Sequence, residues 1–566
     1  MMGKVRANPY AKKSALRRCD HRCRFRRVCS RCQTERRPQL QRLAGRGRRG
    51  TAPLVRFWCA IHHAERLLPT HGQTLLRLVF ESEPEPQLNR RRISCPRGRT
   101  LGGSSAINGM VYVRGHPADF ERWQQLGASG WGYADVLPYF RRAEGTADPT
   151  RDAAYCGTEG PLKTNAGALS NPLHDAFLGA AVDAGHTRSS DLNGYQQEGF
   201  GTLPMTVSEG ERCSAYRAYL NPEFEPALKR ENLQVLSQAM AKRLLIDGSR
   251  CTGVELVIGR NLARIKADQV LLAGGAIGTP QLLLCSGIGP ADHLRGLSIP
   301  VVLDAPEVGN NLRDHLEVYI QQRCSAPVTL NTQLGLLGKA LIGARWLVQK
   351  DGLGATNHFE TGGFIRHAAS APWPNIQFHF LPAAMTYAGD LATRGHGFQV
   401  HVGPMSSESK GTLRLRSADT AQPPELRFNY MSDSQDWEVF RSAIREARSI
   451  FAQPSLEPFS AGEISPGADA DSDSALDAFV RAHAESAYHP CGTCRMGSDP
   501  NAVVDPQGRL NGIDNLWVAD SSVFPHLTNG NLNAPTIMVA EKISDHFRGQ
   551  LLPPQAETWF GQSSHS

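Results

Sequence analysis

Long apolar runs are missing from this chain of 566 residues. Its most apolar stretch, Val270–Leu284, is interrupted by three glycines and a proline. A membrane-spanning helix needs about 20 consecutive apolar residues, so we expect no span. Residues 1–30 also lack the apolar core that follows the basic start of a signal peptide. These two absences predict a cytoplasmic protein.

The cysteines provide no framework for disulfides or for a metal. The chain has 13 of them, an odd number, and five lie in the first 75 residues. Such scatter favours free thiols in a reducing compartment. Cys491 and Cys494 form a CxxC pair, but the sequence places no second thiol pair nearby. We therefore expect no metal site there.

Acidic residues are scarce in the N-terminal segment. Residues 1–75 hold 19 Lys and Arg against 3 Asp and Glu, whereas the rest of the chain holds 43 against 51. Three interpretations compete: an arm that binds nucleic acid or another polyanion, a zinc site, and a stretch translated out of frame. Five residues separate the pair Cys19 and Cys23 from the pair Cys29 and Cys32, which is short for a zinc ribbon.

Codon arithmetic favours the shifted reading frame over the arm. When the codons of Asp20–Arg26 are read one base later, the fixed bases permit Ile-Ile-Val-Val-Gly-Ser-Gly. A buried strand followed by a glycine-rich turn opens a dinucleotide-binding βαβ unit. We therefore interpret residues 1–78 as a basic segment that is non-native or disordered, and we expect no nucleic-acid partner.

A glycine–serine loop follows the start of the body near residue 79. Gly102, Gly103 and Ser104 lie in the string Leu-Gly-Gly-Ser-Ser-Ala. Glycines let a ligand approach the backbone closely, and the serine adds a hydroxyl donor. The loop suits a phosphate or the edge of a flavin, and the alternative is a plain turn.

A strand–loop–helix unit spans residues 269–289. Val270–Leu272 predicts a short buried strand. Thr279 is a good N-cap, and Pro280 fits the first position of a helix. Gly287 can end that helix in the left-handed conformation. Nothing in this unit requires chemistry.

The C-terminal stretch carries the most chemical side chains. Leu516–Ala519 predicts a buried strand that ends at Asp520, a common ligand position in α/β sheets. Residues 533–536 are predicted to cap a final helix, Ile537–Phe547. His489 precedes a proline in a glycine-rich loop, and a single histidine, one of 19 in the chain, is more often structural than catalytic.

Five blocks together resemble the glucose–methanol–choline (GMC) oxidoreductase family of flavoenzymes. They are Gly98–Gly115, Gly275–Gly289, Val308–His315, Tyr488–Gly497 and Gly530–Lys542. The resemblance covers residues 79 to about 549 and is nearest to choline-dehydrogenase-like and aliphatic alcohol dehydrogenases. It departs at the N-terminus, since the first 35 residues contain no G-x-G-x-x-G pattern.

The resemblance implies a mixed α/β fold. An FAD-binding domain of the dinucleotide type would be interleaved with a substrate domain built on an antiparallel sheet. The FAD-binding parts would be residues 79–160, 231–324 and 481–549; the substrate parts, 161–230 and 325–480; and the tail, 550–566. The N-terminal segment would be aberrant.

The resemblance also assigns site residues. His489 matches the histidine that takes the alcohol proton, and Asn533 matches a second active-site position. The FAD contacts would come from Gly102, Gly103, Ser104, Asn108, Gly109, Met110, Val111, Ala241 and Asp520. Some members attach FAD covalently through a histidine where this chain has Ile107, so non-covalent FAD is expected.

The implied reaction is oxidation of a primary alcohol, choline-like or aliphatic, to the aldehyde. Electrons would pass to a non-oxygen acceptor such as a quinone, which allows peripheral attachment to the inner membrane. The alternatives are an oxygen-using oxidase, a lyase that keeps FAD as structure, and a flavin-free protein with a polyanion-binding arm. Substrate contacts could come from Phe359, Glu360, His379, Phe380 and Tyr387, and the oligomeric state stays open.

Overall fold

The computed structural model describes residues 76–220 and 232–561. The basic segment and the predicted shifted-frame strand therefore lie outside the described residues. The helices are α2 (Pro117–Gln125), α3 (Tyr133–Ala143), α4 (Pro172–Asp183), α5 (Ala215–Tyr219), α6 (Gly275–Cys285), α7 (Ala291–Gly296), α8 (Leu336–Gln349), α9 (Ser434–Phe451), α10 (Asp473–His483) and α11 (Asn533–Arg548), with 3-10 turns η3 (Gly103–Ala106), η5 (Leu330–Leu334), η6 (Gly352–Ala355), η7 (Glu457–Phe459) and η8 (Ser521–Val523).

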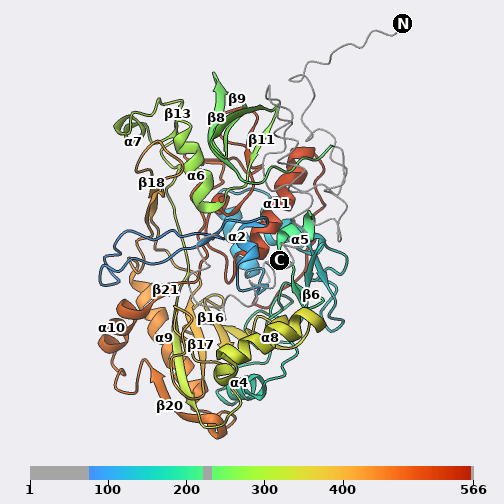
Figure 1. The fold of residues 1–566 in the computed structure, drawn as a ribbon, viewed down its shortest axis with the longest axis vertical. Helices are drawn as coiled ribbons and strands as arrows, with labels where there is room; N and C mark the ends of the chain where they lie inside the picture. Colours follow the sequence, from blue (N-terminus) through green and yellow to red (C-terminus); the bar gives the residue numbers. More distant parts are fainter. Residues whose placement is uncertain (1–75, 221–231, 562–566) are drawn as a thin grey trace.

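Two groups of strands lie in different halves of the molecule (Figure 1). The half drawn at the bottom holds a seven-stranded antiparallel sheet in the order β20-β14-β17-β16-β15-β5, with β21 paired to β14. Its strands are β5 (Gly199–Thr202), β14 (Leu316–Cys324), β15 (Thr361–Ile365), β16 (Ile376–Leu381), β17 (Gly397–Pro404), β20 (Ser460–Ser465) and β21 (Glu485–Ser486). β14 joins it from a stretch that the sequence placed with the FAD-binding part.

The half drawn at the top holds the meander β10-β9-β8 and the parallel pair β11–β22 (Figure 1). The remaining strands are β1 (Arg77–Leu78), β2 (Arg97–Gly98), β3 (Glu144–Thr146), β4 (Leu162–Thr164), β6 (Val207–Ser208), β7 (Glu211–Arg212), β8 (Ala239–Asp247), β9 (Arg250–Ile258), β10 (Asn261–Lys266), β11 (Val270–Leu272), β12 (Ile288–Gly289), β13 (Leu303–Asp304), β18 (Thr412–Arg414), β19 (Glu425–Arg427) and β22 (Leu516–Val518). The mixed α/β class is as expected.

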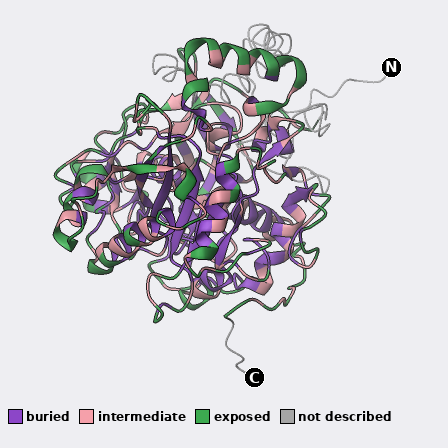
Figure 2. Ribbon diagram, turned by 90° about the horizontal axis from the view of Figure 1, so that it is seen from below, coloured by how far each residue is buried: buried purple, intermediate pink, exposed green. Residues whose placement is uncertain are grey.

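The large sheet has one apolar and one polar face. Side chains alternate along a strand, so one set of residues points to each side. Phe380 stacks on Phe177 of α4, and Phe398 contacts Phe451 of α9. The other face carries polar side chains in neighbouring strands: Tyr319 of β14, Gln399 and His401 of β17, and Gln377 and His379 of β16. Most of the ribbon in the interior of the molecule is coloured as buried (Figure 2).

Helix α6 begins earlier than the sequence predicted. It starts at Gly275 rather than at Pro280, which lies inside the helix. A proline in a helix cannot donate to the carbonyl four residues before it, here that of Ala276. The hydroxyl of Thr493 donates to this carbonyl at 2.7 Å and replaces the missing bond. The predicted N-cap, Thr279, instead donates its hydroxyl to Asp520. Gly287 does adopt the left-handed conformation, with φ of 84°.

Helix α11 also starts earlier than expected, at Asn533 instead of Ile537. Its proline falls in the first turn, where the missing N–H costs nothing. Arg142 of α3 forms ion pairs with Glu541 and Asp545, and so joins α3 to α11. Within residues 76–220 and 232–561, no helix combines the length and apolarity that a membrane crossing requires.

Candidate functional site

The backbone of His489 is held by a buried carboxylate. Asp314 accepts a hydrogen bond from the His489 N–H at 2.6 Å, and its second oxygen accepts from the hydroxyls of Tyr430 and Ser486. Burial raises the pKa of Asp314. Tyr488, just before the histidine, has a φ of 66°. A carboxylate with this many donors fixes the loop, and with it the start of the His489 side chain.

The hydrogen bonds of two histidine rings fix where their protons lie. His315 Nε2 is 3.0 Å from the carbonyl oxygen of Met405, which only accepts, so this nitrogen carries the proton. In the neutral ring His315 Nδ1 is then an acceptor. It lies 3.1 Å from His489 Nδ1, which must therefore be the donor. His489 Nε2 is left with a lone pair.

Burial keeps both rings neutral. It lowers the pKa of His489 well below its ordinary value of 6.5, and the neighbouring His315 lowers it further. Burial likewise lowers the pKa of His315 to about 4. A neutral imidazole with a directed lone pair can accept a proton.

The amide next to His489 is that of Asn531. Its Nδ2 donates to His489 Nε2 at 3.2 Å. Its Oδ1 accepts from Gln377 Nε2 at 3.1 Å and from His379 Nε2 at 3.2 Å, so the orientation of the amide is set by the polar face of the sheet. The sequence pointed to Asn533 for this place. Asn533 instead begins α11, and its active-site role stays a prediction.

A carboxylate and aromatic rings follow His315 along the polar face. Glu317 and Tyr319 continue β14, and His401 Nδ1 lies 3.2 Å from Glu317 Oε1. The Tyr319 ring stacks on Tyr387, with ring centroids 3.8 Å apart, and on His401 at 3.7 Å. Residues two apart on a strand point the same way and lie about 7 Å from each other. Glu317 and Tyr319 thus extend the surface that begins at His315.

The predicted cofactor loop has the geometry of a cradle. Gly102 and Gly103 have φ of 90° and 56° and open the turn η3. No described atom lies within 4 Å of where a Cβ would stand on Gly103, so a ligand can lie against this backbone. The Ser104 hydroxyl accepts from Gly98 N at 3.2 Å. These features fit the edge of a flavin.

The start of α11 fits the same group. Its first N–H groups have no side-chain cap, and they form the positive end of a 16-residue helix. The loop just before it carries Asn531, next to His489. Such donors suit the carbonyl-bearing edge of an isoalloxazine.

The other predicted cofactor residues, 108–111, follow the turn η3. Asn108 accepts from Met110 N at 3.1 Å, Asn357 donates to Gly109 O at 3.0 Å, and Val111 is buried.

Two predicted cofactor residues lie in the half with the parallel pair. Asp520 accepts from Gly275 N, the Thr279 hydroxyl and Ser522 N, so it ties α6 to the end of β22. Ala241 lies half-buried on β8. Their contacts to FAD stay predictions. Within the described ranges no group of His, Cys, Asp and Glu could hold a metal ion.

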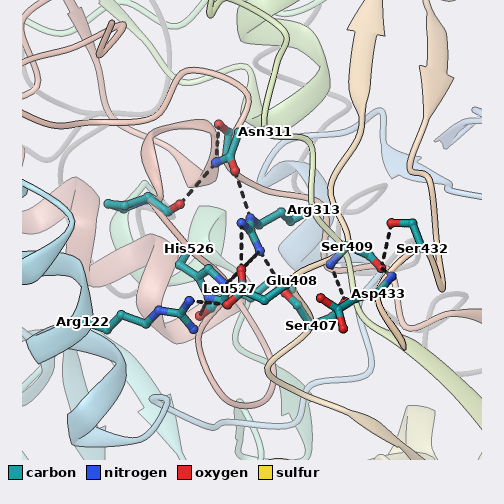
Figure 3. A network of polar contacts seen from close by, with 12 residues as sticks. Arg122, Asn311, Arg313, Ser407, Glu408, Ser409, Ser432, Asp433, His526 and Leu527 are labelled. Carbon is teal, nitrogen blue, oxygen red and sulfur yellow. Dashed lines mark hydrogen bonds and ion pairs between the residues drawn. The ribbon is translucent and has the colours of Figure 1, made fainter. Parts of the chain in front are cut away.

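A second polar network lies around Arg313, the residue just before Asp314 (Figure 3). Arg313 donates to Ser407 O at 2.9 Å and to His526 Nε2 at 2.8 Å. Glu408 pairs with Arg313 and Arg122. Burial lowers the pKa of His526 to about 4, so it accepts from the arginine as a neutral ring. The network joins the Asp314–His315 segment to the loop that leads to Asn531. Of these residues only Arg313 lies in one of the five blocks, Val308–His315, and the sequence gave it no role.

Comparison with known proteins agrees with this geometry. The GMC oxidoreductase family matches residues 31–317 and 407–540. An oxygen-dependent choline dehydrogenase of Brucella canis is 50% identical over 485 residues, 85% of this chain and 87% of that protein. One of Photobacterium profundum is 52% identical over 487 residues, 85% of each chain.

Solved structures share the fold. Pyridoxine 4-oxidase from Mesorbium loti superposes with a TM-score of 0.77 at 28% identity, over 86% of this chain and 91% of that one. Formate oxidase gives 0.78 at 23% identity, over 87% and 90%, which shows the fold alone. The expected flavoprotein class and non-covalent FAD are confirmed by the family. The chain belongs to the GMC oxidoreductase family.

Proposed function

We propose that this chain oxidises a primary alcohol of the choline type to its aldehyde, with His489 as the base. The observation that carries the proposal is the chain of hydrogen bonds from Met405 O through His315 to His489, which leaves a lone pair on His489 Nε2. An alcohol bound against this nitrogen can lose its hydroxyl proton to it.

Each side chain near the alcohol oxygen has a separate role in the proposed reaction. His489 Nε2 takes the proton. The Asn531 amide N–H donates to His489 Nε2 in the structure, so the alcohol oxygen must displace it from this nitrogen; the amide then donates to the alcohol oxygen as its negative charge develops. His315 stabilises the histidine in the proton-accepting form. FAD, when bound, supplies the acceptor for the hydride that leaves the alcohol carbon. Loss of one proton and one hydride converts the alcohol to the aldehyde.

A quaternary ammonium group suits the surface beyond His315. Glu317 offers a carboxylate, and Tyr387 offers an aromatic ring, which attract such a cation, whereas the Tyr319 ring is stacked between Tyr387 and His401. Glu317 lies one same-side step along the strand from His315, about 7 Å away. The relatives whose printed name is choline dehydrogenase are consistent with this substrate.

For the electron acceptor we propose a quinone-type molecule, as the sequence comparison with acceptor-linked alcohol dehydrogenases suggests. Dioxygen is the second candidate, because the printed name of the relatives describes them as oxygen-dependent. Oxygen consumption by the choline-reduced enzyme, compared with reduction of a soluble quinone, decides between the two acceptors.

The base is tested with the flavin-loaded protein and His489→Ala. Removal of a general base costs about 10²–10⁴ in rate, so reduction of the flavin by choline under anaerobic conditions should slow by at least about tenfold. The control is His483→Ala, which changes an exposed histidine on α10 and should reduce at the wild-type rate. Equal rates for His489→Ala and wild type would remove His489 from this role.

A further inference from the structure

Helix α8 is attached to the body by one stripe of side chains. Trp346 is 2% exposed, and its indole N–H donates to Gly210 O at 2.7 Å. Gly354 packs against the same ring. Gly338 and Ile342 precede Trp346 at intervals of four and are half-buried, so they lie on the same stripe. The opposite side of α8 must therefore face away from the protein.

That outward side consists of aliphatic residues. Helix α8 crosses the lower half of the molecule in Figure 1, and most of its residues are exposed. The large apolar side chains on it are Leu336, Leu337, Leu341, Leu347 and Val348, exposed by 84%, 75%, 63%, 56% and 82%. Among the described residues, the four most exposed large apolar side chains all belong to this set.

The spacing places these residues on one continuous face. At 100° per residue, the five side chains and the exposed Ala340 and Ala344 fall within an arc of about 140°. Solvent-exposed aliphatic surface on this scale marks an interaction site. We call these seven residues the α8 face.

The size and composition of the α8 face argue against a second protein molecule as its partner. A stable protein interface uses about 20–30 residues on each side and is enriched in aromatic residues and arginine. The α8 face has seven residues, all of them Leu, Val or Ala. A helix that lies in the surface of a bilayer needs only one such face.

The cationic residues of α8 stand at the edges of the face. Lys339 lies on one side of the arc and Arg345 lies on the other, and the helix contains no acidic residue. Lys350 follows the helix in the left-handed conformation, and its amino group lies over the Trp346 ring and pairs with Glu211. Arg345 pairs with Asp351. Long basic side chains at this position reach up to lipid headgroups while their stems stay among the acyl chains.

We propose that α8 is a membrane-binding helix that inserts the α8 face into the surface of a lipid bilayer. The partner is a lipid surface, and the attraction is mainly apolar, with the edge cations adding a contact to anionic headgroups. The inference stands on the exposure of α8 and does not depend on which alcohol is oxidised. If the acceptor is a lipid-soluble quinone, this helix brings the enzyme to it.

Flotation with vesicles tests the proposal on the full chain. The probe is a vesicle of phosphatidylcholine with about 30% phosphatidylglycerol, at a salt concentration of about 0.5 M that screens exposed charges. Wild type should float with the vesicles, and the triple variant Leu337→Ser, Leu341→Ser, Val348→Ser should float at least tenfold less. The matched control is Leu262→Ser with Leu551→Ser, at side chains exposed by 59% and 53% elsewhere, and it should float like wild type.

Three outcomes would overturn the proposal. Wild type that fails to float excludes lipid binding under these conditions. A triple variant that floats like wild type assigns the binding to another surface or to the basic residues 1–75. A triple variant that differs from wild type in oligomeric mass without lipid, and equals it in flotation, assigns the α8 face to a second copy. Thermal unfolding should match between variants, and Leu341→Ser alone provides the test if the triple variant does not fold.

Discussion

His315 controls which nitrogen of His489 carries the proton. It does so from a fully buried position, through Nδ1 atoms 3.1 Å apart, without forming part of the reacting pair itself. His315 is the last residue of one of the family blocks, Val308–His315, but the block assigned it no role. A motif states which residue occurs at a position, whereas the role of His315 follows from the Met405 carbonyl, 90 residues away along the chain.

We predict a changed pH profile for His315→Ala. In wild type the base has a pKa well below 6.5. It is protonated, and activity lost, only as the pH falls through that low value, so flavin reduction should stay flat from pH 8 to below 6.5. The variant admits water beside His489, which moves its pKa back toward about 6.5, and its rate should fall as the pH drops through that value.

The same variant should be about fivefold slower at pH 8, since a net hydrogen bond is worth roughly 1 kcal/mol. His315→Gln, whose amide oxygen can accept from His489 Nδ1, should recover part of the rate. Rapid-mixing measurements of flavin reduction across pH check both statements. A variant with a flat profile and full rate would mean that His315 only fills space.

Glu317 is the residue on which a cationic substrate should depend. We predict that Glu317→Gln raises KM for choline by at least about tenfold, because a neutral amide of the same shape replaces the carboxylate. A quaternary ammonium has no N–H to donate, so the carboxylate attracts it by charge alone, and two unit charges about 4 Å apart near a protein surface attract by about 4 kcal/mol before desolvation. For a neutral alcohol of similar size, KM should change by less than about twofold. Steady-state kinetics with both alcohols provide the comparison. An equal change for both would show that Glu317 does not recognise charge.

The helices show where local signals mislead. Threonine followed by proline usually begins a helix, and that rule placed the start of α6 four to five residues too late. The structure continues the helix through Pro280 because the Thr493 hydroxyl, from the loop after His489, satisfies the carbonyl of Ala276. A sequence window around residue 280 cannot contain that information. The left-handed Gly287 was predictable because it depends only on the local backbone.

We predict that Thr493→Val destabilises the protein. Valine has the same shape as threonine but no hydroxyl, so the fully buried site keeps its packing and leaves the Ala276 carbonyl unpaired. A buried unsatisfied group costs about 1–3 kcal/mol. Denaturant unfolding measures the loss of free energy. The control, Thr158→Val, changes an exposed threonine and should shift stability by less than about 0.5 kcal/mol. Equal stability of both variants would make the Thr493 bond dispensable.

On the scale of the whole molecule, the chain has candidate binding residues for the flavin end of FAD but lacks the usual sequence for its dinucleotide end. The flavin end would lie at Gly102–Gly103, which the sequence predicted as cofactor contacts, and at the positive end of α11, for which the sequence predicted no such role. The dinucleotide end needs a strand, a glycine-rich turn and a helix N-terminus. The sequence has the literal pattern at Gly45, Gly47 and Gly50. It lies outside the described residues, and the nine residues before it do not have the apolar character of a buried strand.

We therefore predict that the chain as written, when purified, holds well below one FAD per molecule. The pyrophosphate normally rests on backbone N–H groups at the start of the first helix, and residues 1–75 place no apolar strand before their G-x-G-x-x-G pattern. A version in which the codons of residues 20–33 are read one base later should bind FAD at close to one per chain, because it regains an apolar strand and glycine turn. The visible spectrum, with FAD assayed after acid release, measures both ratios. One FAD per molecule in the chain as written would contradict this prediction. It would show that the chain binds the cofactor without the shifted-frame strand and turn, and the shifted-frame interpretation would then have no functional consequence.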